Sequence, residues 1–125
     1  MAHVGWRGLL KGIVRNMIMA VPEDQRAGMQ LAAGPGICAK HYEIGSEVAD
    51  QFSKHPRLAK CVREIDGTPH LDLVQGVIAE GNAFEVDVDT STFACTYEND
   101  FTSSYRRDKE AFTPMAAFIV RLGGA

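Results

Sequence analysis

The chain has 125 residues, of which 46% are hydrophobic and 23% are charged, a composition typical of one globular domain with a modest core. The formal net charge of −3 excludes the strong positive field of a nucleic-acid-binding protein, and no apolar run is long enough to cross a bilayer. The three cysteines are too few, and odd in number, for a disulfide framework, so we expect a reducing, cytoplasmic compartment.

The first predicted element is a helix. Apolar residues recur at three- and four-residue steps from Leu9 to Ile18, and Pro22 ends the pattern. Residues 1–22 contain basic but no acidic residues, which leaves a mitochondrial presequence as a minor alternative. Several glycines in this segment disfavour a targeting helix, so we interpret it as part of the fold.

The middle of the chain alternates strand and helix signals. Residues 29–33 predict a short buried strand, which the Gly-Pro-Gly sequence at 34–36 breaks into a loop. A second helix is predicted to begin with Ser46 as its N-cap and to end before Pro56. The loop between these two elements carries Cys38, Lys40, His41 and Tyr42.

The second half of the chain predicts three strands and one helix. Residues 61–65 are expected to form a strand followed by an Asp-Gly turn, and residues 71–79 a helix closed by Gly-Asn. Apolar and acidic residues alternate over 84–89, the pattern of a half-exposed strand, and residues 115–120 predict a final buried strand. The mixture predicts an α/β or α+β fold in a single domain, residues 1–125.

Several short motifs stand out along the chain. They are His-Val-Gly-Trp-Arg-Gly at 3–8, Gly-Pro-Gly-Ile at 34–37, Tyr-Glu-Ile-Gly at 42–45, His-Leu-Asp-Leu at 70–73, Cys-Thr-Tyr at 95–97, Ser-Tyr-Arg-Arg-Asp at 104–108 and Met-Ala at 115–116. In this order they resemble the C-terminal half of the laccase-domain, or multicopper polyphenol oxidase, family. These are the YfiH-type proteins described as purine nucleoside phosphorylases. The resemblance implies a fold of layered sheets and helices.

The resemblance also implies a metal site, with zinc as the expected ion and copper as an alternative. In the family the ligands are two histidines and one cysteine, and His3 matches one of these histidines. The other two belong to Gln-Val-His and Asp-Cys-Leu-Pro motifs that precede the matching segment, so we expect a second chain, a homo-oligomer or an upstream segment to supply them. Cys38 and His41, spaced C-x-x-H, are local substitutes, and the alternative for His3 is a solvated terminal residue.

Arginines are the candidate groups for phosphate. Arg7, flanked by Trp6 and a glycine, suits bidentate binding of an oxyanion or ribose hydroxyl, with a surface ion pair as the alternative. Phosphorolysis needs cations that hold phosphate, and Arg106 and Arg107 are candidates, with Tyr105 beside them as a substrate contact. The alternative is a structural cluster in which Asp108 pairs one of these arginines.

Cys95 and His70 complete the set of candidate residues. Cys95 is either a nucleophile activated by a nearby base, for which His70 is the candidate, or a buried inert thiol. His70 and Asp72 share a face if they lie in a strand, whereas Asp72 favours the first turn if a helix starts there. The sequence leaves both readings open, and with them a role for His70 in substrate contact.

Two functions of different classes follow from the resemblance. The first is a zinc-dependent purine nucleoside phosphorylase, with adenosine deamination as a further activity, whose partners are a purine nucleoside and phosphate. The second is a catalytically incomplete half-domain that acts as a binding or assembly module, or a split-gene fragment. Phenol oxidation by a copper cluster is disfavoured because the chain has only four histidines. Neither function requires nucleic acid or a membrane.

Overall fold

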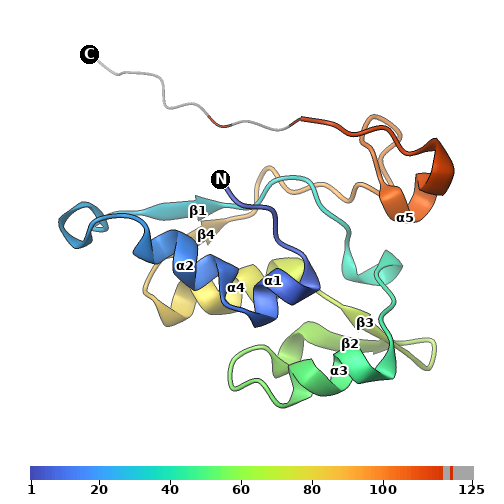
Figure 1. Cartoon of the computed structure of the whole chain (residues 1–125), viewed down its shortest axis with the longest axis horizontal. Coiled ribbons are helices and arrows are strands. Elements are labelled where there is room, and N and C mark those ends of the chain that lie inside the picture. Colours follow the sequence, from blue (N-terminus) through green and yellow to red (C-terminus); the bar gives the residue numbers. More distant parts are fainter. Residues whose placement is uncertain (117–118, 120–125) are drawn as a thin grey trace.

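The computed structural model describes residues 1–116 and 119 (Figure 1). Within them, one sheet of two strands is parallel and another is antiparallel, which confirms the predicted mixed α/β class. No helix of the described residues is both long enough and apolar enough to cross a membrane. The helices are α1 (Trp6–Leu10), α2 (Ile13–Met19), α3 (Ser46–Ser53), α4 (Leu73–Ala83) and α5 (Tyr105–Asp108), and the strands are β1 (Gln30–Ala32), β2 (Val62–Ile65), β3 (Thr68–Leu71) and β4 (Asp87–Asp89).

The first predicted helix is two helices. Gly12 adopts a left-handed backbone, with φ of 83°, and separates α1 from α2. Glycine adopts this conformation without steric cost, so the chain can turn here while the apolar stripe continues on both sides. Leu9 of α1 and Val14 and Ile18 of α2 are all buried, which confirms the predicted apolar face. The prediction of one continuous helix is wrong, because the face is shared by two helices.

Helix α4 and strand β4 are the helix and strand predicted for residues 71–79 and 84–89, with different bounds. Leu71 belongs to β3, and Asp72 caps α4 by accepting a hydrogen bond of 3.0 Å from the Gln75 backbone N–H. The helix runs past the predicted Gly-Asn stop, and Glu85 turns the chain with a φ of 58°. Only residues 87–89 therefore remain as a strand, and they pair in parallel with β1.

Strands β2 and β3 form a hairpin whose Asp66-Gly67 turn was correctly predicted. Both turn residues have positive φ, 52° and 78°, as a two-residue turn of this kind requires. Helix α3 begins one residue earlier than predicted, because Gly45, not Ser46, has the extended N-cap backbone and Ser46 is already helical. The strand predicted over residues 115–120 includes residues 117, 118 and 120, which lie outside the described part of the chain.

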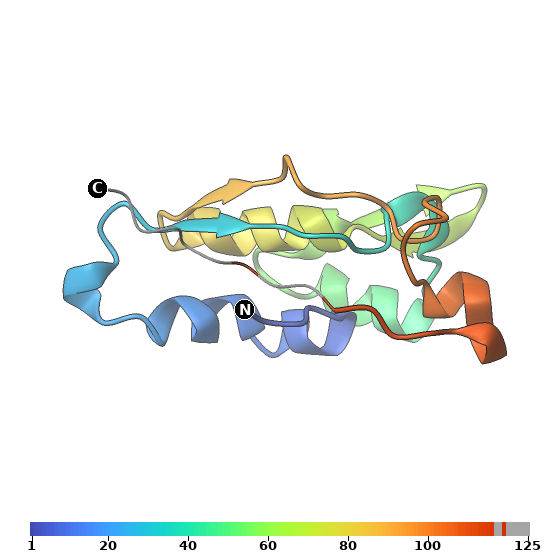
Figure 2. The ribbon, with the colours of Figure 1, turned by 90° about the horizontal axis from the view of Figure 1, so that it is seen from above.

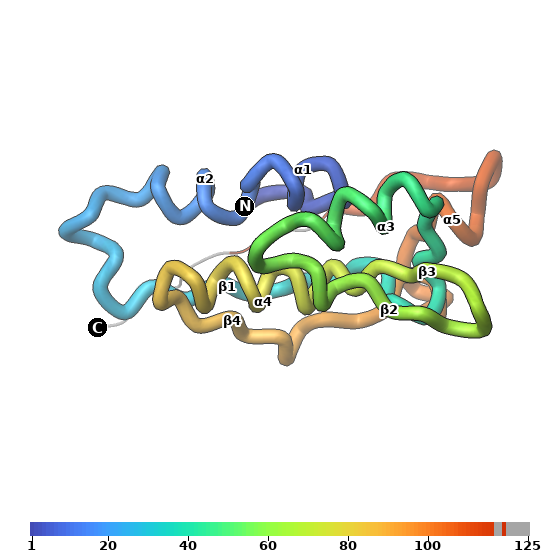
Figure 3. The backbone as a smooth tube through the Cα atoms, turned by 90° about the horizontal axis from the view of Figure 1, so that it is seen from below, coloured from blue at the N-terminus to red at the C-terminus, as the bar shows by residue number. Residues whose placement is uncertain are grey.

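The elements pack in two layers around α4. Figure 2 shows α1 and α2 along one side of the molecule and α4 with β1 and β4 along the other. Helix α4 contacts α1 and α2 on one face and β4 on another. In Figure 3, α3 continues the layer of α1, and the β2–β3 hairpin continues the layer of α4. Their buried side chains form one core, which includes Leu9, Val14, Ile18, Leu31, Val48, Phe52, Leu58 and Leu71.

Helix α4 carries one buried charge. Glu80 is 1% exposed, and its carboxylate accepts two hydrogen bonds from Arg57, from Nε at 2.7 Å and from Nη2 at 3.1 Å. This bidentate pairing compensates the carboxylate for its lost water, and it raises the pKa of the Arg57 guanidinium. The pair ties the segment after α3 to helix α4.

Glycines on α4 allow its neighbours to approach closely. A Cβ at Gly81 would lie 2.6 Å from Val88 Cγ2 and 3.0 Å from the Val86 carbonyl oxygen, which is backbone and cannot rotate away. We expect Gly81→Ala to lower the free energy of unfolding by about 1–3 kcal/mol through overpacking. Urea denaturation measures this change.

A second glycine substitution provides the matched control. A Cβ at Gly8 in α1 meets only ordinary contacts, the nearest at 3.6 Å. Gly8→Ala should therefore leave stability unchanged or raise it by roughly 0.5–1 kcal/mol through helix propensity. Equal stability of the two variants would contradict the close packing of α4 against β4.

Candidate functional site

The candidate site lies where two loops distant in sequence run side by side. Gly36 and Cys95 form an isolated parallel bridge. The Gly36 backbone N–H donates to the Ala94 carbonyl at 3.1 Å, and the Thr96 N–H donates to the Gly36 carbonyl at 2.8 Å. These bonds hold residues 36–42 against residues 94–98 and bring the two groups of candidate residues together.

The bridge places Cys38 next to Cys95. The Cys38 backbone N–H donates to the Cys95 sulfur at 3.3 Å. Burial is the main cause that raises the pKa of the Cys38 thiol to about 11, and its contact with Cys95 adds to the rise. Burial also acts to raise the pKa of Cys95, but hydrogen bonds from the Cys38 thiol and from nearby backbone N–H groups outweigh it and lower that pKa.

Glu98 and His41 extend this group. Cys38, Cys95 and Glu98 each offer a ligand atom, and the three atoms lie within 4.8 Å of one another. His41 Nε2 lies 2.9 Å from Glu98 Oε1, and its ring stacks on Tyr97 at a centroid distance of 4.2 Å. Glu98 was not among the predicted site residues, although it follows Cys95 at C-x-x-E spacing in the sequence.

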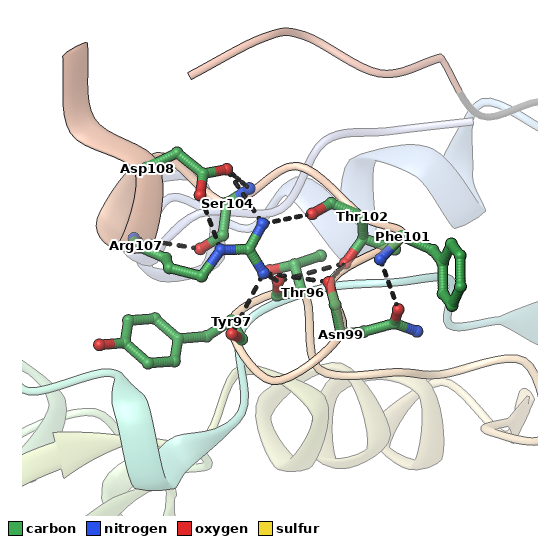
Figure 4. Close-up of polar contacts among 8 residues, drawn as sticks. All are labelled: Thr96, Tyr97, Asn99, Phe101, Thr102, Ser104, Arg107 and Asp108. Atoms are coloured by element: carbon green, nitrogen blue, oxygen red, sulfur yellow. Dashed lines mark hydrogen bonds and ion pairs between the residues drawn. The ribbon is translucent and has the colours of Figure 1, made fainter. Parts of the chain in front are cut away.

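Arg107 organises the loop that carries these residues (Figure 4). Its Nη1 and Nη2 donate to four backbone carbonyls, and Nε and Nη2 also bind the Asp108 carboxylate. The guanidinium is thereby committed to the protein itself. The accepting carbonyls belong to Thr96, Tyr97, Asn99 and Thr102. The structural alternative for one arginine, pairing with Asp108, is thus the observed arrangement of Arg107.

Arg106 points to a different place. Its Nη1 donates to the Glu43 carbonyl at 3.0 Å, and its guanidinium carbon lies 5.1 Å from the centre of the Tyr42 ring. It borders an open hollow of about 400 Å³. The hollow is lined by Lys40, His41, Glu43, His70, Tyr97, Arg106, Arg107 and Lys109.

Tyr42 connects this hollow to the N-terminal motif. Burial raises the pKa of the Tyr42 hydroxyl, and Arg106, the Trp6 backbone N–H and Arg7 partly offset that rise. Arg106 and Arg7 therefore approach the same phenol from two parts of the chain. The Arg7 guanidinium lies 4.3 Å from the centre of the neighbouring Trp6 ring, a cation–π contact.

His70 and Tyr105 occupy contrasting environments. His70 lies in β3 and is 8% exposed; its Nδ1 donates to the Ala39 carbonyl at 2.7 Å, and its Nε2 lies 3.1 Å from Thr68 Oγ1. Both readings left open for His70 and Asp72 apply in part, since one is in a strand and the other caps a helix. Tyr105 is 73% exposed and contacts Phe112 edge to face.

The residues around His3 do not fit a complete zinc site. A catalytic zinc needs about three protein ligands and an open position. His3 is exposed, and among residues 1–116 and 119 the one group of three candidate ligands is Cys38, Cys95 and Glu98. The structure therefore does not bring His3 together with Cys38 and His41, the local substitutes considered from the sequence.

Comparison with known proteins identifies the family. Residues 1–122 match the family described as multi-copper polyphenol oxidoreductase laccase. The chain is 37% identical to a purine nucleoside phosphorylase of Deinococcus radiodurans, over 86% of this chain and 42% of that protein. It is 33% identical to the purine nucleoside phosphorylase YfiH of Escherichia coli, over 94% and 49%. The chain belongs to this family, which confirms the resemblance read from its motifs.

Two further relatives bear on fold and activity. The chain is 35% identical to adenosine deaminase RL5 of an unknown prokaryotic organism, over 58% of this chain and 29% of that protein. A crystal structure of protein NMB0706 of Neisseria meningitidis matches with a TM-score of 0.67 and 30% identity, over 86% of this chain and 45% of that one. The chain thus spans about half the length of the relatives named purine nucleoside phosphorylase, at 42% and 49%.

Because Arg107 donates hydrogen bonds to several groups of its loop at once, we predict that lysine cannot replace it. One ammonium cannot reproduce the planar fork that bonds four carbonyls and a carboxylate. We expect Arg107→Lys to lower the urea midpoint of unfolding and to speed hydrogen exchange of the Asn99 and Thr102 amides, which bond within the loop. Arg15→Lys, at an exposed position on α2, should change neither. Unchanged exchange in Arg107→Lys would contradict the role assigned to this side chain.

The same cluster predicts a dependence of stability on acid. Hydrogen bonds from Arg107, and next from the Ser104 backbone N–H, lower the pKa of Asp108 below its ordinary value. The resulting stabilisation is fully present above a pH of about 4 and is lost as the pH falls through the lowered pKa of the folded state. Asp108→Asn should therefore flatten the acid limb of a stability–pH profile, whereas Asp24→Asn, at an exposed position elsewhere, should leave it intact.

Proposed function

We propose that this chain is part of a purine nucleoside phosphorylase, and that the hollow beside Arg106 binds its phosphate. The relatives that carry this name cover most of the chain. The observation that carries the proposal is the charge of the hollow. Its lining includes two lysines and two arginines, against one acidic residue, Glu43. A dianion such as phosphate is the ligand that such a lining attracts.

Within the hollow, Arg106 is the candidate for direct contact. In the described residues its guanidinium donates to the single carbonyl of Glu43, so other N–H groups remain for an oxyanion. Arginine binds phosphate oxygens through two parallel hydrogen bonds, and Tyr42 supports the planar group from one face. Lys40 and Lys109 add charge at the rim. Arg107, although it borders the same hollow, has its donors directed at the loop.

The reaction needs few chemical groups beyond these. In phosphorolysis a phosphate oxygen bonds to C1′ of the ribose, the bond from C1′ to the purine nitrogen breaks, and the departing purine takes up a proton. Cations that fix the phosphate hold the attacking oxygen in place and offset charge that shifts in the transition state. We assign this role to Arg106, with Arg7 as a further cation near Tyr42 and Trp6 as the flat apolar surface for the purine.

The remaining candidates receive narrower roles. His70 holds the Ala39 carbonyl and so positions the 3-10 turn Ala39–His41 that carries Lys40, instead of contacting substrate itself. Tyr105, largely exposed, is a contact at the rim. Cys95 faces Cys38 and Glu98, and we assign it no part in phosphorolysis. The three cysteines are free thiols, and we place the protein in the cytoplasm.

A zinc-dependent activity would need ligands in addition to His3. We assign His3 as one ligand of a site that a second chain or a further segment completes, because His3 has no second and third ligand beside it among the described residues. Adenosine deamination, the activity in the name of one relative, would share that requirement. The second candidate function is a non-catalytic binding module, which would need no metal at His3.

Phosphate binding tests the proposal directly. Titration of the chain with inorganic phosphate, followed by phosphorus NMR or calorimetry, should show saturable binding. Arg106→Gln should weaken that binding about 10- to 100-fold, the range expected for loss of a charge-assisted bidentate contact. Arg15→Gln, at an exposed arginine on α2, should bind like the unsubstituted chain. Absence of binding, or equal binding by both variants, would overturn the assignment of this hollow.

A second measurement separates the two candidate functions. Hypoxanthine released from inosine and phosphate should be measured with the same samples. Release that depends on phosphate and falls in Arg106→Gln supports the phosphorylase. Phosphate binding with no release, by a chain incubated with zinc, identifies the binding module.

A further inference from the structure

We propose that Cys38, Cys95 and Glu98 form a binding site for a thiophilic divalent cation, with Zn²⁺ as the ion that fits best. This site does not use His3 and does not depend on the proposed phosphorylase activity. It follows from three side chains that two loops bring together, and it lies beside the phosphate hollow instead of within the N-terminal motif.

The backbone fixes two of the three ligands before any metal binds. The Gly36–Cys95 bridge sets the two loops in register, and the Cys38 N–H bond to the Cys95 sulfur orients that sulfur toward Cys38. Glu98 follows in the turn that begins at Cys95, closed by a bond of 3.1 Å from the Asn99 N–H to the Cys95 carbonyl. The C-x-x-E spacing therefore places thiol and carboxylate on the same side of one turn.

The separations suit a tetrahedral ion. Zinc–sulfur bonds of about 2.3 Å place two tetrahedral sulfurs roughly 3.8 Å apart. The three ligand atoms already lie within 4.8 Å of one another, so closure on an ion needs side-chain movements of about 1 Å or less. Two sulfurs and one carboxylate oxygen favour zinc over magnesium or calcium, which take oxygen ligands.

The surroundings provide the support that metal ligands usually have. His41 and Lys40 both contact Glu98 Oε1, at 2.9 Å and 3.9 Å, and so hold the carboxylate in place. Two thiolates and a carboxylate carry three negative charges, which a divalent cation and the Lys40 ammonium balance. Cys38 also borders a second open hollow, of about 340 Å³, which gives an ion an entry path and leaves room for a water as fourth ligand.

Cobalt titration of the reduced, metal-free chain tests this site. Co²⁺ bound by thiolates gives intense charge-transfer absorption in the near ultraviolet, which histidine or carboxylate ligands alone do not produce. We expect one equivalent of Co²⁺ to develop this absorption and one equivalent of Zn²⁺ to abolish it. Glu98→Gln, at a half-exposed side chain whose substitution should not affect folding, should weaken binding about 10- to 100-fold.

Matched variants identify the ligands. Cys38→Ser and Cys95→Ser should each weaken the thiolate absorption and the double variant should lose it, whereas Cys61→Ala, at the third cysteine, and His3→Ala should retain it. Glu64→Gln, on the exposed side of β2, should bind like the unsubstituted chain. Three results would overturn the proposal: no thiolate absorption in the reduced chain, full absorption in the double serine variant, or equal affinities of Glu98→Gln and Glu64→Gln.

Discussion

The candidate sites depend on the hydrogen bonds that the Arg107 guanidinium donates. By donating to four carbonyls of residues 96–102 and to Asp108, it joins the loop after Cys95 to the first turn of α5. An arginine can do this because its donors lie in one rigid plane and stay protonated at any physiological pH. The loop then holds Glu98 beside Cys95, and α5 carries Arg106 over Tyr42.

The adjacent residues Arg106 and Arg107 therefore have different roles. The side chain of Arg107 is 24% exposed and is used up in holding backbone, whereas Arg106 has one carbonyl partner in the described residues and borders the cationic hollow. The Gly36–Cys95 bridge holds residues 36–42 beside the loop that Arg107 stabilises. The proposed phosphate site and the proposed cation site are thus neighbours on one pair of adjacent loops, with Lys40 and His41 lying between them.

Much of the fold was readable from the sequence, but its boundaries were not. Apolar spacing predicted the buried face of residues 9–18, and the strand before the Asp66-Gly67 turn was predicted, whereas its partner β3 was not. The break at Gly12 was not predicted, because a continuous apolar stripe is compatible with one helix or with two. The extension of α4 to Ala83 shortened the predicted strand, since tertiary packing against β4 overrides a local glycine signal.

The candidate sites were predicted only in part, because sequence spacing does not give side-chain direction or long-range pairing. The candidate residues included Arg106, Arg107, Cys38, Cys95 and His41, and all five lie on the two adjacent loops or on the following helix α5. Sequence spacing could not tell which arginine faces solvent, because adjacent residues on a short helix differ only in direction. It also could not pair Cys38 with Cys95, which are 57 residues apart and meet through a single backbone bridge.

The division of labour between Arg106 and Arg107 is the central claim, and a crystal structure of the chain grown with tungstate, a heavy analogue of phosphate, tests it most directly. The account predicts anomalous density within hydrogen-bonding distance of the Arg106 guanidinium, with the bonds of Arg107 to the carbonyls of residues 96–102 intact. An anion held by Arg107 in place of those carbonyls, or bound away from both arginines, would contradict it.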